Sequence, residues 1–250
     1  MNSKYKLKQI FLEMKDALRG EEHDYTQGNL KRAGFLLSVP MVLEMLMESI
    51  FAIVDIFFVS KLGADAIATV GLTESIITII YAIASGLSVA TSAIVSRRIG
   101  EKKEEKASLY SYKSIITCII ISIFIAVPGI LFSKDILRLM NASDTIVNDM
   151  STYTTIMFGS NLVILMLFIN NAIFRSSGNP VIALKVLLFA NGINIILDPL
   201  FIFGWGPIPA MGVKGAAIAT TIGRGLAVLL QFYYLLKGGG KIKLIGINLK

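Results

Sequence analysis

The chain contains six apolar stretches of about twenty residues or more, separated by polar and charged segments. A helix of roughly 20 residues rises the ~30 Å needed to cross the hydrocarbon core of a bilayer. The stretches lie at Gly34–Val59, Ala66–Val95, Ser114–Phe132, Thr152–Ile173, Val181–Phe203 and Gly215–Leu236. This pattern predicts an all-α integral membrane protein, a bundle of six transmembrane helices embedded in the lipid bilayer.

Composition agrees with lipid as the solvent. Hydrophobic residues make up 54% of the chain and charged residues 16%, whereas a soluble domain carries about 25% charged residues. The net charge of +7 does not indicate a nucleic-acid partner, because the basic residues lie between the apolar stretches. The only histidine, His23, is in the polar N-terminal segment, and the only cysteine, Cys118, is within an apolar stretch. We therefore expect no enzyme activity, no cofactor and no cysteine or histidine metal cluster.

Three regions are expected along the chain. Residues 1–32 form a cytoplasmic N-terminal segment in which Ile10, Phe11, Met14 and Leu18 have helical spacing. This segment is either an amphipathic helix on the membrane surface or a solvated leader helix. Residues 33–237 form the six-helix transmembrane lobe, and residues 238–250 begin a cytoplasmic linker.

The basic residues predict the orientation in the membrane, because cytoplasmic loops retain Lys and Arg. Nineteen of them fall on the side that holds both ends of the chain and four on the other side, while Arg224 lies within the sixth stretch. Both ends are therefore predicted to be cytoplasmic, with the protein in the cell inner (plasma) membrane.

Acidic residues inside the apolar stretches are the strongest functional signal. Each costs about 2.5–3.5 kcal/mol at mid-membrane on insertion scales, so such residues usually face a bundle interior or an aqueous cavity. Glu44, Glu48 and Asp55 share one face of the first helix, and Glu74 lies in the second. The three glutamates either line a cavity or form structural hydrogen bonds, and the sequence leaves both readings open.

Depth brings four further polar positions to one level. With the predicted orientation, Asp55, Asp198 and Thr220 lie roughly 6–8 Å below the outer boundary at 1.5 Å per residue, and Asn194 lies one turn deeper. Their oxygens are hard ligands for a small cation, and buried carboxyl groups can also carry protons. Asp55 and Asp198 have no basic partner in the outer half of any predicted helix. We predict a cation or proton site at these four residues.

The sequence supports less specific predictions for the other polar and helix-breaking residues. Pro40, Pro128 and Pro199 are expected to interrupt their helices, as in transporters with broken helices. Arg175 is expected to extend to the lipid headgroups. Arg224 is a candidate partner for one of the glutamates, and the sequence does not indicate which one.

An ordered set of motifs resembles the multidrug and toxic compound extrusion (MATE) family, from about Gly28 to the end of the chain. The motifs are Pro40, Val54–Val59, Leu62-Gly63, Ser96–Lys103, Arg175–Pro180, Asn194–Leu200 and Gly212–Thr220. The resemblance implies one six-helix lobe of a twelve-helix transporter, with residues 238–250 leading to the second lobe. It also implies a cation site in the N-terminal lobe at Asp55, Asn194, Asp198 and Thr220.

The resemblance further implies function. Members of the family exchange Na⁺ or H⁺ for cationic or amphipathic small molecules, which predicts an antiporter that exports drugs by alternating access. The chain would supply the N-terminal half, and its partner would be a C-terminal lobe or a second half-size chain. The alternatives are a lipid-linked saccharide flippase of related architecture and a nonfunctional or structural membrane fragment.

Overall fold

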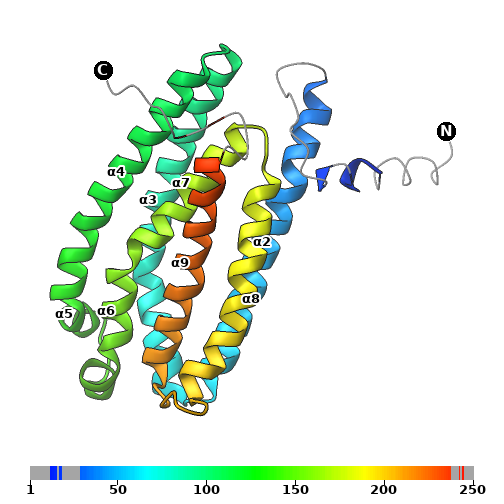
Figure 1. The fold of residues 1–250 in the computed structure, drawn as a ribbon. Helices are drawn as coiled ribbons and strands as arrows, with labels where there is room; N and C mark the ends of the chain where they lie inside the picture. The colour runs from blue at the N-terminus through cyan, green and yellow to red at the C-terminus, as the bar shows by residue number, and fades with distance from the viewer. Residues whose placement is uncertain (1–11, 16, 19–28, 238–241, 243, 245–250) are drawn as a thin grey trace.

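A computed structural model describes residues 12–15, 17–18, 29–237, 242 and 244 (Figure 1). These residues form a bundle of helices and contain no β-strand. The helices are α2 (Leu30–Ser60), α3 (Ala64–Gly100), α4 (Glu104–Leu131), α5 (Ser133–Leu139), a π-helical turn (Ile146–Met150), α6 (Ser151–Gly159), α7 (Asn161–Ser176), α8 (Val181–Phe203) and α9 (Val213–Lys237). The predictions for residues 1–32 and 238–250 lie mostly outside the described residues.

The six predicted transmembrane stretches all appear as helical segments of the bundle. Five segments of the described chain are long and apolar enough to cross a membrane by length and composition. The sixth, α2, has 31 residues but carries the acidic residues singled out in the sequence. The predicted fold class, an all-α membrane bundle of six helices, is confirmed.

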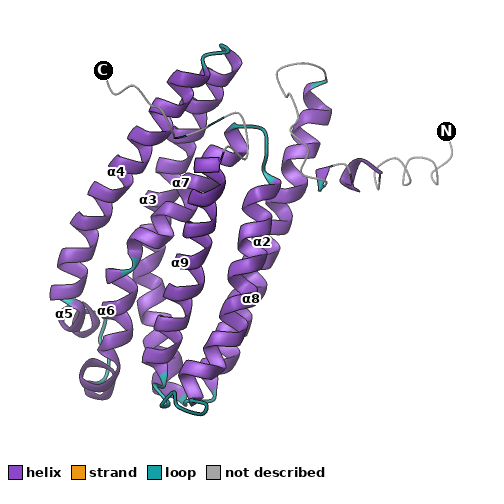
Figure 2. Ribbon diagram, viewed as in Figure 1, coloured by secondary structure: helices purple, strands orange, loops and turns teal. Residues whose placement is uncertain are grey.

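The predicted helix interruptions at proline are wrong. Helix α2 continues through Pro40, α4 through Pro128 and α8 through Pro199. The interruption occurs instead in the fourth stretch, where α6 ends at Gly159 and α7 begins at Asn161 (Figure 2). No proline is present there.

Polar side chains satisfy the backbone at this break. The Asn161 side-chain amide donates to the carbonyl groups of Phe158 (2.6 Å) and Ser122 (3.2 Å). Thr221 on α9 donates to the Ser160 hydroxyl at 3.1 Å. Buried backbone groups need such partners, so α4 and α9 together hold the break between α6 and α7 in place.

Helix α8 lies between α2 and α9, and α3 packs along α7 (Figure 1). Small residues let α9 approach α8 closely: a Cβ at Gly215 would collide with the backbone carbonyl of Phe201. The fully buried side chains of Leu165, Ile169 and Ile173 place α7 at the centre of the core. This packing fixes the level at which residues of α8 and α9 face one another.

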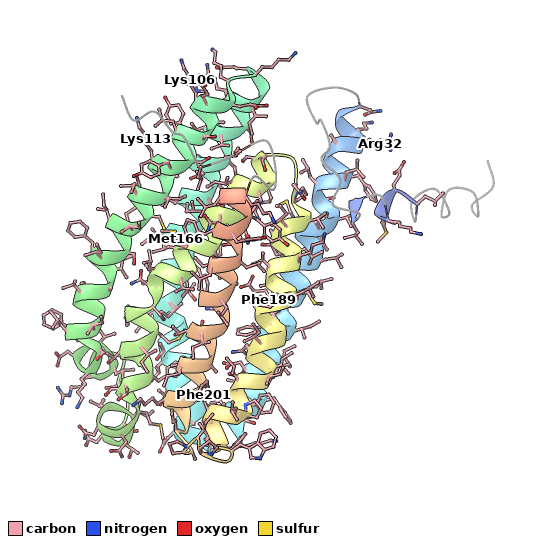
Figure 3. All side chains as sticks on the ribbon, in the orientation of Figure 1. Arg32, Lys106, Lys113, Met166, Phe189 and Phe201 are labelled. Atoms are coloured by element: carbon pink, nitrogen blue, oxygen red, sulfur yellow. The ribbon has the colours of Figure 1, made fainter. Side chains whose placement is uncertain are left out.

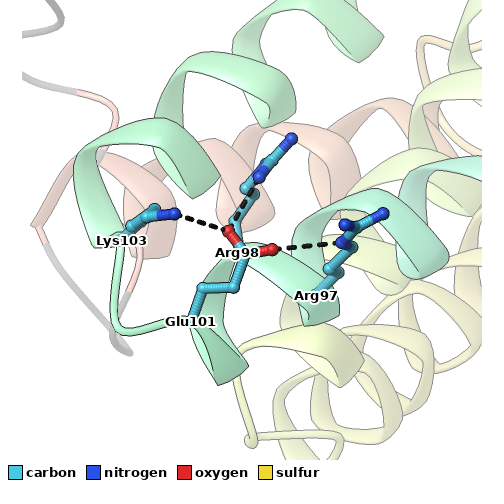
Figure 4. Close-up of polar contacts among 4 residues, drawn as sticks. All are labelled: Arg97, Arg98, Glu101 and Lys103. Atoms are coloured by element: carbon cyan, nitrogen blue, oxygen red, sulfur yellow. Dashed lines mark hydrogen bonds and ion pairs between the residues drawn. The ribbon is translucent and has the colours of Figure 1, made fainter.

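The segment between α3 and α4 is held by charge. Glu101 accepts hydrogen bonds from Arg98 (2.7 Å), Arg97 (3.1 Å) and Lys103 (3.1 Å), as Figure 4 shows. Lys102, between these residues, has a positive φ of 58°. One carboxylate thus ties together the end of α3 and the beginning of α4.

The start of α2 and the end of α9 lie at the same end of the bundle (Figure 1). Arg32, Lys106 and Lys113 lie toward this end as well (Figure 3). Ile242, which follows α9, is buried against the hydrophobic core. The bundle therefore has one basic end, and both ends of the described helical region are located there.

Candidate functional site

Three of the four predicted cation-site residues form a hydrogen-bonded group between α8 and α9. The Asn194 amide nitrogen donates to Asp198 Oδ1 at 3.1 Å and to Thr220 Oγ1 at 3.4 Å. Asn194 and Asp198 are one turn apart on α8 and therefore share a face of that helix. Asp198 has no solvent exposure, and Asn194 is only 1% exposed.

Asp55 lies on α2, which packs along α8. Its side chain forms no hydrogen bond with Asn194, Asp198 or Thr220 in the part of the chain that the structure describes. Helix α2 thus carries a second carboxylate on the helix next to α8, outside the hydrogen-bonded group.

Three oxygens at this site are buried and accept no hydrogen bond within the described residues. They are Asp55 Oδ1, Asn194 Oδ1 and Asp198 Oδ2. A buried polar atom without a partner costs about 1–3 kcal/mol, and a charged one costs more. Carboxylate and amide oxygens are hard ligands suited to a small cation, and a carboxylate without a partner can also take a proton. The site therefore has the chemistry to bind a cation or a proton.

Two adjoining chambers lie on the α2 side of the bundle, and neither is lined by Asn194, Asp198 or Thr220. The Asp55 chamber, of about 570 Å³, is lined by Asp55, Glu48, Glu74 and Arg224 among others. The Glu44 chamber, of about 530 Å³, extends from there toward the basic end of the bundle. Residues from α2, α3, α7 and α9 line both chambers, so the acids of α2 face a cavity between helices.

Glu44 belongs to a polar network that the sequence did not predict. The amide of Asn171 donates to Glu44 at 2.6 Å, and Arg175 forms an ion pair with the same carboxylate at 3.5 Å. Gln231 donates to Asn171 at 2.7 Å and accepts from Asn170 at 3.1 Å. The network joins α2, α7 and α9 across the Glu44 chamber.

The structure corrects two readings of the basic residues. Arg175 does not extend to the headgroups; it binds Glu44 and the Ser88 hydroxyl. Arg224 forms no ion pair within the described residues; its guanidinium lies 5.3 Å from the centre of the Phe51 ring and beside the Tyr81 hydroxyl. Arg224 also lines the Asp55 chamber, so Asp55 and a basic residue border the same cavity.

Some of these residues could have been identified from the sequence. The adjacent amides Asn170 and Asn171, and Gln231 in the sixth stretch, are polar residues within apolar helices, which usually face other helices. Tyr81 and Phe168, which line both chambers, could not be identified from the sequence, because aromatic residues are common in any apolar stretch. Within the described residues, no group of three or more His, Cys, Asp and Glu side chains is placed to hold a metal ion.

Comparison with known proteins identifies the family. The MatE family matches residues 40–200, well over half of the chain. The chain belongs to the MatE family. The solved structure of a MATE protein in the bent conformation matches 92% of the chain, with a TM-score of 0.83 and 29% sequence identity. A transporter from Pyrococcus furiosus, whose description reports reverse polarity of the binding pocket, gives a TM-score of 0.82 at 28% identity over 92% of the chain and 51% of its own.

Curated relatives are also similar in sequence. A multidrug export protein MepA from Staphylococcus haemolyticus is 30% identical over 84% of this chain and 46% of its own length. An FAD transporter from Shewanella oneidensis is 28% identical over 86% of this chain and 48% of its own length. The chain thus spans about half the length of the curated relatives it matches, and those relatives are transporters.

Proposed function

We propose that this chain is the N-terminal lobe of a cation-coupled antiporter that exports cationic or amphipathic small molecules. Three buried oxygens without hydrogen-bond partners, from Asp55, Asn194 and Asp198, carry this proposal. Together with Thr220, they provide the ligands for the coupling Na⁺ or H⁺. No other cofactor is needed. The adjoining cavity would hold the exported molecule, and a MepA relative supports the multidrug class of substrate.

The position of the proposed cation site supports a mechanism of alternating access. Asp55 lies on α2, and Asn194, Asp198 and Thr220 lie on α8 and α9. A cation bound among them stabilises the arrangement that brings α2 against α8. It shifts the equilibrium between conformations by no more than its difference in affinity for the two. Binding of the cation or proton at this site would thereby drive release of the substrate to the outside.

We further propose that a second six-helix lobe, from the same polypeptide or from another chain, completes the transporter. The relatives are about twice as long as the matched region, which supports this arrangement. The basic end of the bundle, where Arg32 and Lys106 lie, would face the cytoplasm, so both ends of this lobe are cytoplasmic. The protein would lie in the plasma membrane.

The test is transport by the complete transporter in proteoliposomes with an imposed Na⁺ or proton gradient. Asp55→Asn and Asp198→Asn should each abolish gradient-driven drug transport while leaving membrane insertion unchanged, because the site loses a carboxylate. Asp65→Asn is the matched control, since Asp65 is exposed in the first turn of α3 and does not line the cavity. Transport that persists in both site variants would refute the proposal.

A further inference from the structure

The end of α3 and the first part of α4 form a charged surface at the basic end of the bundle. Residues 97–113 include six basic and three acidic residues, so positive charge is in excess there. Lys106 and Lys113 lie on α4 at this end (Figure 3). No residue from 97 to 113 lines either chamber of the cavity. This surface is therefore separate from the proposed cation site and from the proposed substrate cavity.

Two cations from neighbouring helices lie beside one aromatic ring on this surface. The Cζ atom of Arg98, near the end of α3, lies 5.3 Å from the centre of the Tyr110 ring on α4. The ammonium group of Lys113, one turn further along α4, lies 5.8 Å from the same centre. A cation near the face of an aromatic ring is attracted to it, so Tyr110 brings both charges to one small area.

The charge of these two residues is only partly compensated by the protein. Arg98 donates to Glu101 at 2.7 Å, and 25% of its side chain remains exposed. The same carboxylate also accepts from Arg97 and Lys103, so one negative charge serves three basic side chains. The ammonium group of Lys113 is exposed and forms no hydrogen bond or ion pair with the residues that the structure describes. An anion is therefore needed to balance this area.

Arg98 and Lys113 lie at the level expected for lipid headgroups. The apolar stretch of α3 ends at Val95, three residues before Arg98, and that of α4 begins at Ser114, immediately after Lys113. Lys and Arg at the ends of membrane helices extend to the headgroup region. Lys106 is seven residues before Lys113 and thus lies about 10 Å further from the membrane, at 1.5 Å per residue.

An exposed apolar stripe continues from Lys113 into the membrane. It consists of Ile116, Ile120 and Phe124, which follow Lys113 at intervals of three and four residues and so share its face of α4. All three side chains are exposed. A free phosphate ion or a soluble acidic peptide would leave this stripe uncovered, whereas the acyl chains of a lipid would cover it. The surface is therefore complementary to a lipid with an anionic headgroup.

We propose that Arg98 and Lys113 bind the phosphate of an anionic glycerophospholipid, whose acyl chains lie along the apolar stripe of α4. An arginine can form paired hydrogen bonds with a phosphate, and a lysine adds a point charge. Glu101 holds Arg98 in position for this contact. A zwitterionic headgroup such as phosphatidylcholine fits less well, because its own cation would lie among the excess basic residues. This lipid site goes beyond the proposed transport function and does not depend on it.

The test uses two photoreactive lipids that differ only in the headgroup. A phosphatidylglycerol and a phosphatidylcholine carry a diazirine on the same acyl chain, and each is present at a low fraction in phosphatidylcholine nanodiscs that hold the complete transporter. Mass spectrometry after illumination measures how much of the α4 segment 114–131 is labelled. The phosphatidylglycerol probe should label this segment of the wild type at least fivefold more than the phosphatidylcholine probe does.

Variants of Lys113 test the site itself. Lys113→Met should lower labelling by the phosphatidylglycerol probe about fivefold, the contribution of one basic residue near a membrane surface, and should leave labelling by the phosphatidylcholine probe unchanged. Lys113→Arg keeps the charge and should keep the labelling. Since this side chain is exposed and has no ion pair among the described residues, neither variant should disturb folding.

Lys106→Met is the matched control. It removes the same charge from the same face of α4, because the two lysines are seven residues apart, but at a position about 10 Å further from the membrane. At 0.15 M salt this distance exceeds the Debye length of about 8 Å. Labelling by the phosphatidylglycerol probe should therefore fall by less than twofold.

Three results would overturn the proposal. Equal labelling of the wild type by the two probes would show no preference for an anionic headgroup. Equal losses in Lys113→Met and Lys106→Met would show a diffuse attraction and no site at Lys113. Displacement of the phosphatidylglycerol probe by millimolar inorganic phosphate would show a site for free anions. The proposed cation site is tested separately, by transport in the variants of Asp55 and Asp198.

Discussion

Asn171 donates a hydrogen bond of 2.6 Å to the Glu44 carboxylate, so two residues 127 positions apart in the sequence meet across the cavity. The same carboxylate pairs with Arg175, which is mostly buried. Among the described residues, Glu44 is therefore the only residue of α2 whose side chain bonds to side chains of α7.

Replacing Glu44 by Ala should lower the free energy of unfolding by about 1–3 kcal/mol, because Asn171 and Arg175 lose their acceptor in a half-buried setting. Thermal unfolding in nanodiscs measures the change. Glu48→Ala is the matched control, since Glu48 lies one turn away on α2 and its side chain makes no hydrogen bond or ion pair within the described residues. Equal destabilisation by the two variants would contradict this account.

Gly215 should not tolerate a side chain. A Cβ at this position would overlap the backbone carbonyl of Phe201, and backbone atoms cannot rotate away as a side chain can. Gly215→Ala should therefore destabilise the bundle by about 1–3 kcal/mol, as overpacking does. Gly225→Ala, in the same helix with nothing within 4 Å of its Cβ position, should be neutral or stabilising by up to about 1 kcal/mol. Thermal unfolding of the two variants compares them, and the opposite ranking would refute the close approach of α8 and α9.

The sequence could predict the group on α8 and α9 because helical geometry alone sets its depth. Asn194 and Asp198 are four residues apart in one apolar stretch, and Thr220 lies at a matching distance from the start of the next. Two consecutive antiparallel helices are neighbours in most bundles. Counting residues along the two helices was therefore enough to predict that Asn194, Asp198 and Thr220 lie close together.

The partners of Glu44 could not be predicted by counting residues in this way. They depend on which helices are neighbours across the cavity, and the order of helices around a bundle is not set by their apolar periodicity. The break at Ser160 was missed for a different reason. It is stabilised by Asn161 and Thr221 from within the fold, whereas the prolines on which the prediction relied are accommodated inside continuous helices.

Glu101 should titrate far below an ordinary glutamate. Hydrogen bonds from Lys103, Arg98 and Arg97 lower its pKa from 4.5 to about 2. Since the folded-state pKa is the lower one, the stabilisation is fully present above pH 4.5 and is lost as the pH falls toward 2. Carbon-13 NMR of the glutamate carboxylates should find Glu101 still ionised at pH 3.

The control for this titration is Lys103→Met, which removes the largest contribution and should move the midpoint of Glu101 upward. Added salt should act in the same direction, because the basic side chains are partly exposed and their charges are screened. A midpoint near 4.5 in the wild type would show that these contacts do not persist in solution.

Thr220 and Thr221 are neighbours on α9 with different partners, which allows a matched test of the cation site. Thr220 Oγ1 accepts from Asn194 beside Asp198, whereas Thr221 donates to Ser160 at the break between α6 and α7. An amide and a hydroxyl add neutral oxygens to the carboxylates, which suits Na⁺ more than a proton. Na⁺ in place of choline should therefore stabilise the folded protein, by about 2.7 kcal/mol at one hundred times the dissociation constant.

Thr220→Val should reduce this Na⁺-dependent rise in melting temperature, because it removes a ligand oxygen with little change in shape. Thr221→Val should lower the melting temperature in both salts and leave the rise produced by Na⁺ intact, since its hydroxyl serves the helix break and lies outside the group formed by Asn194 and Asp198. The comparison cancels the general effect of placing a valine in α9. If both variants kept the full Na⁺ response, Thr220 would have no part in binding the cation, and the site would reduce to the amide and the two carboxylates.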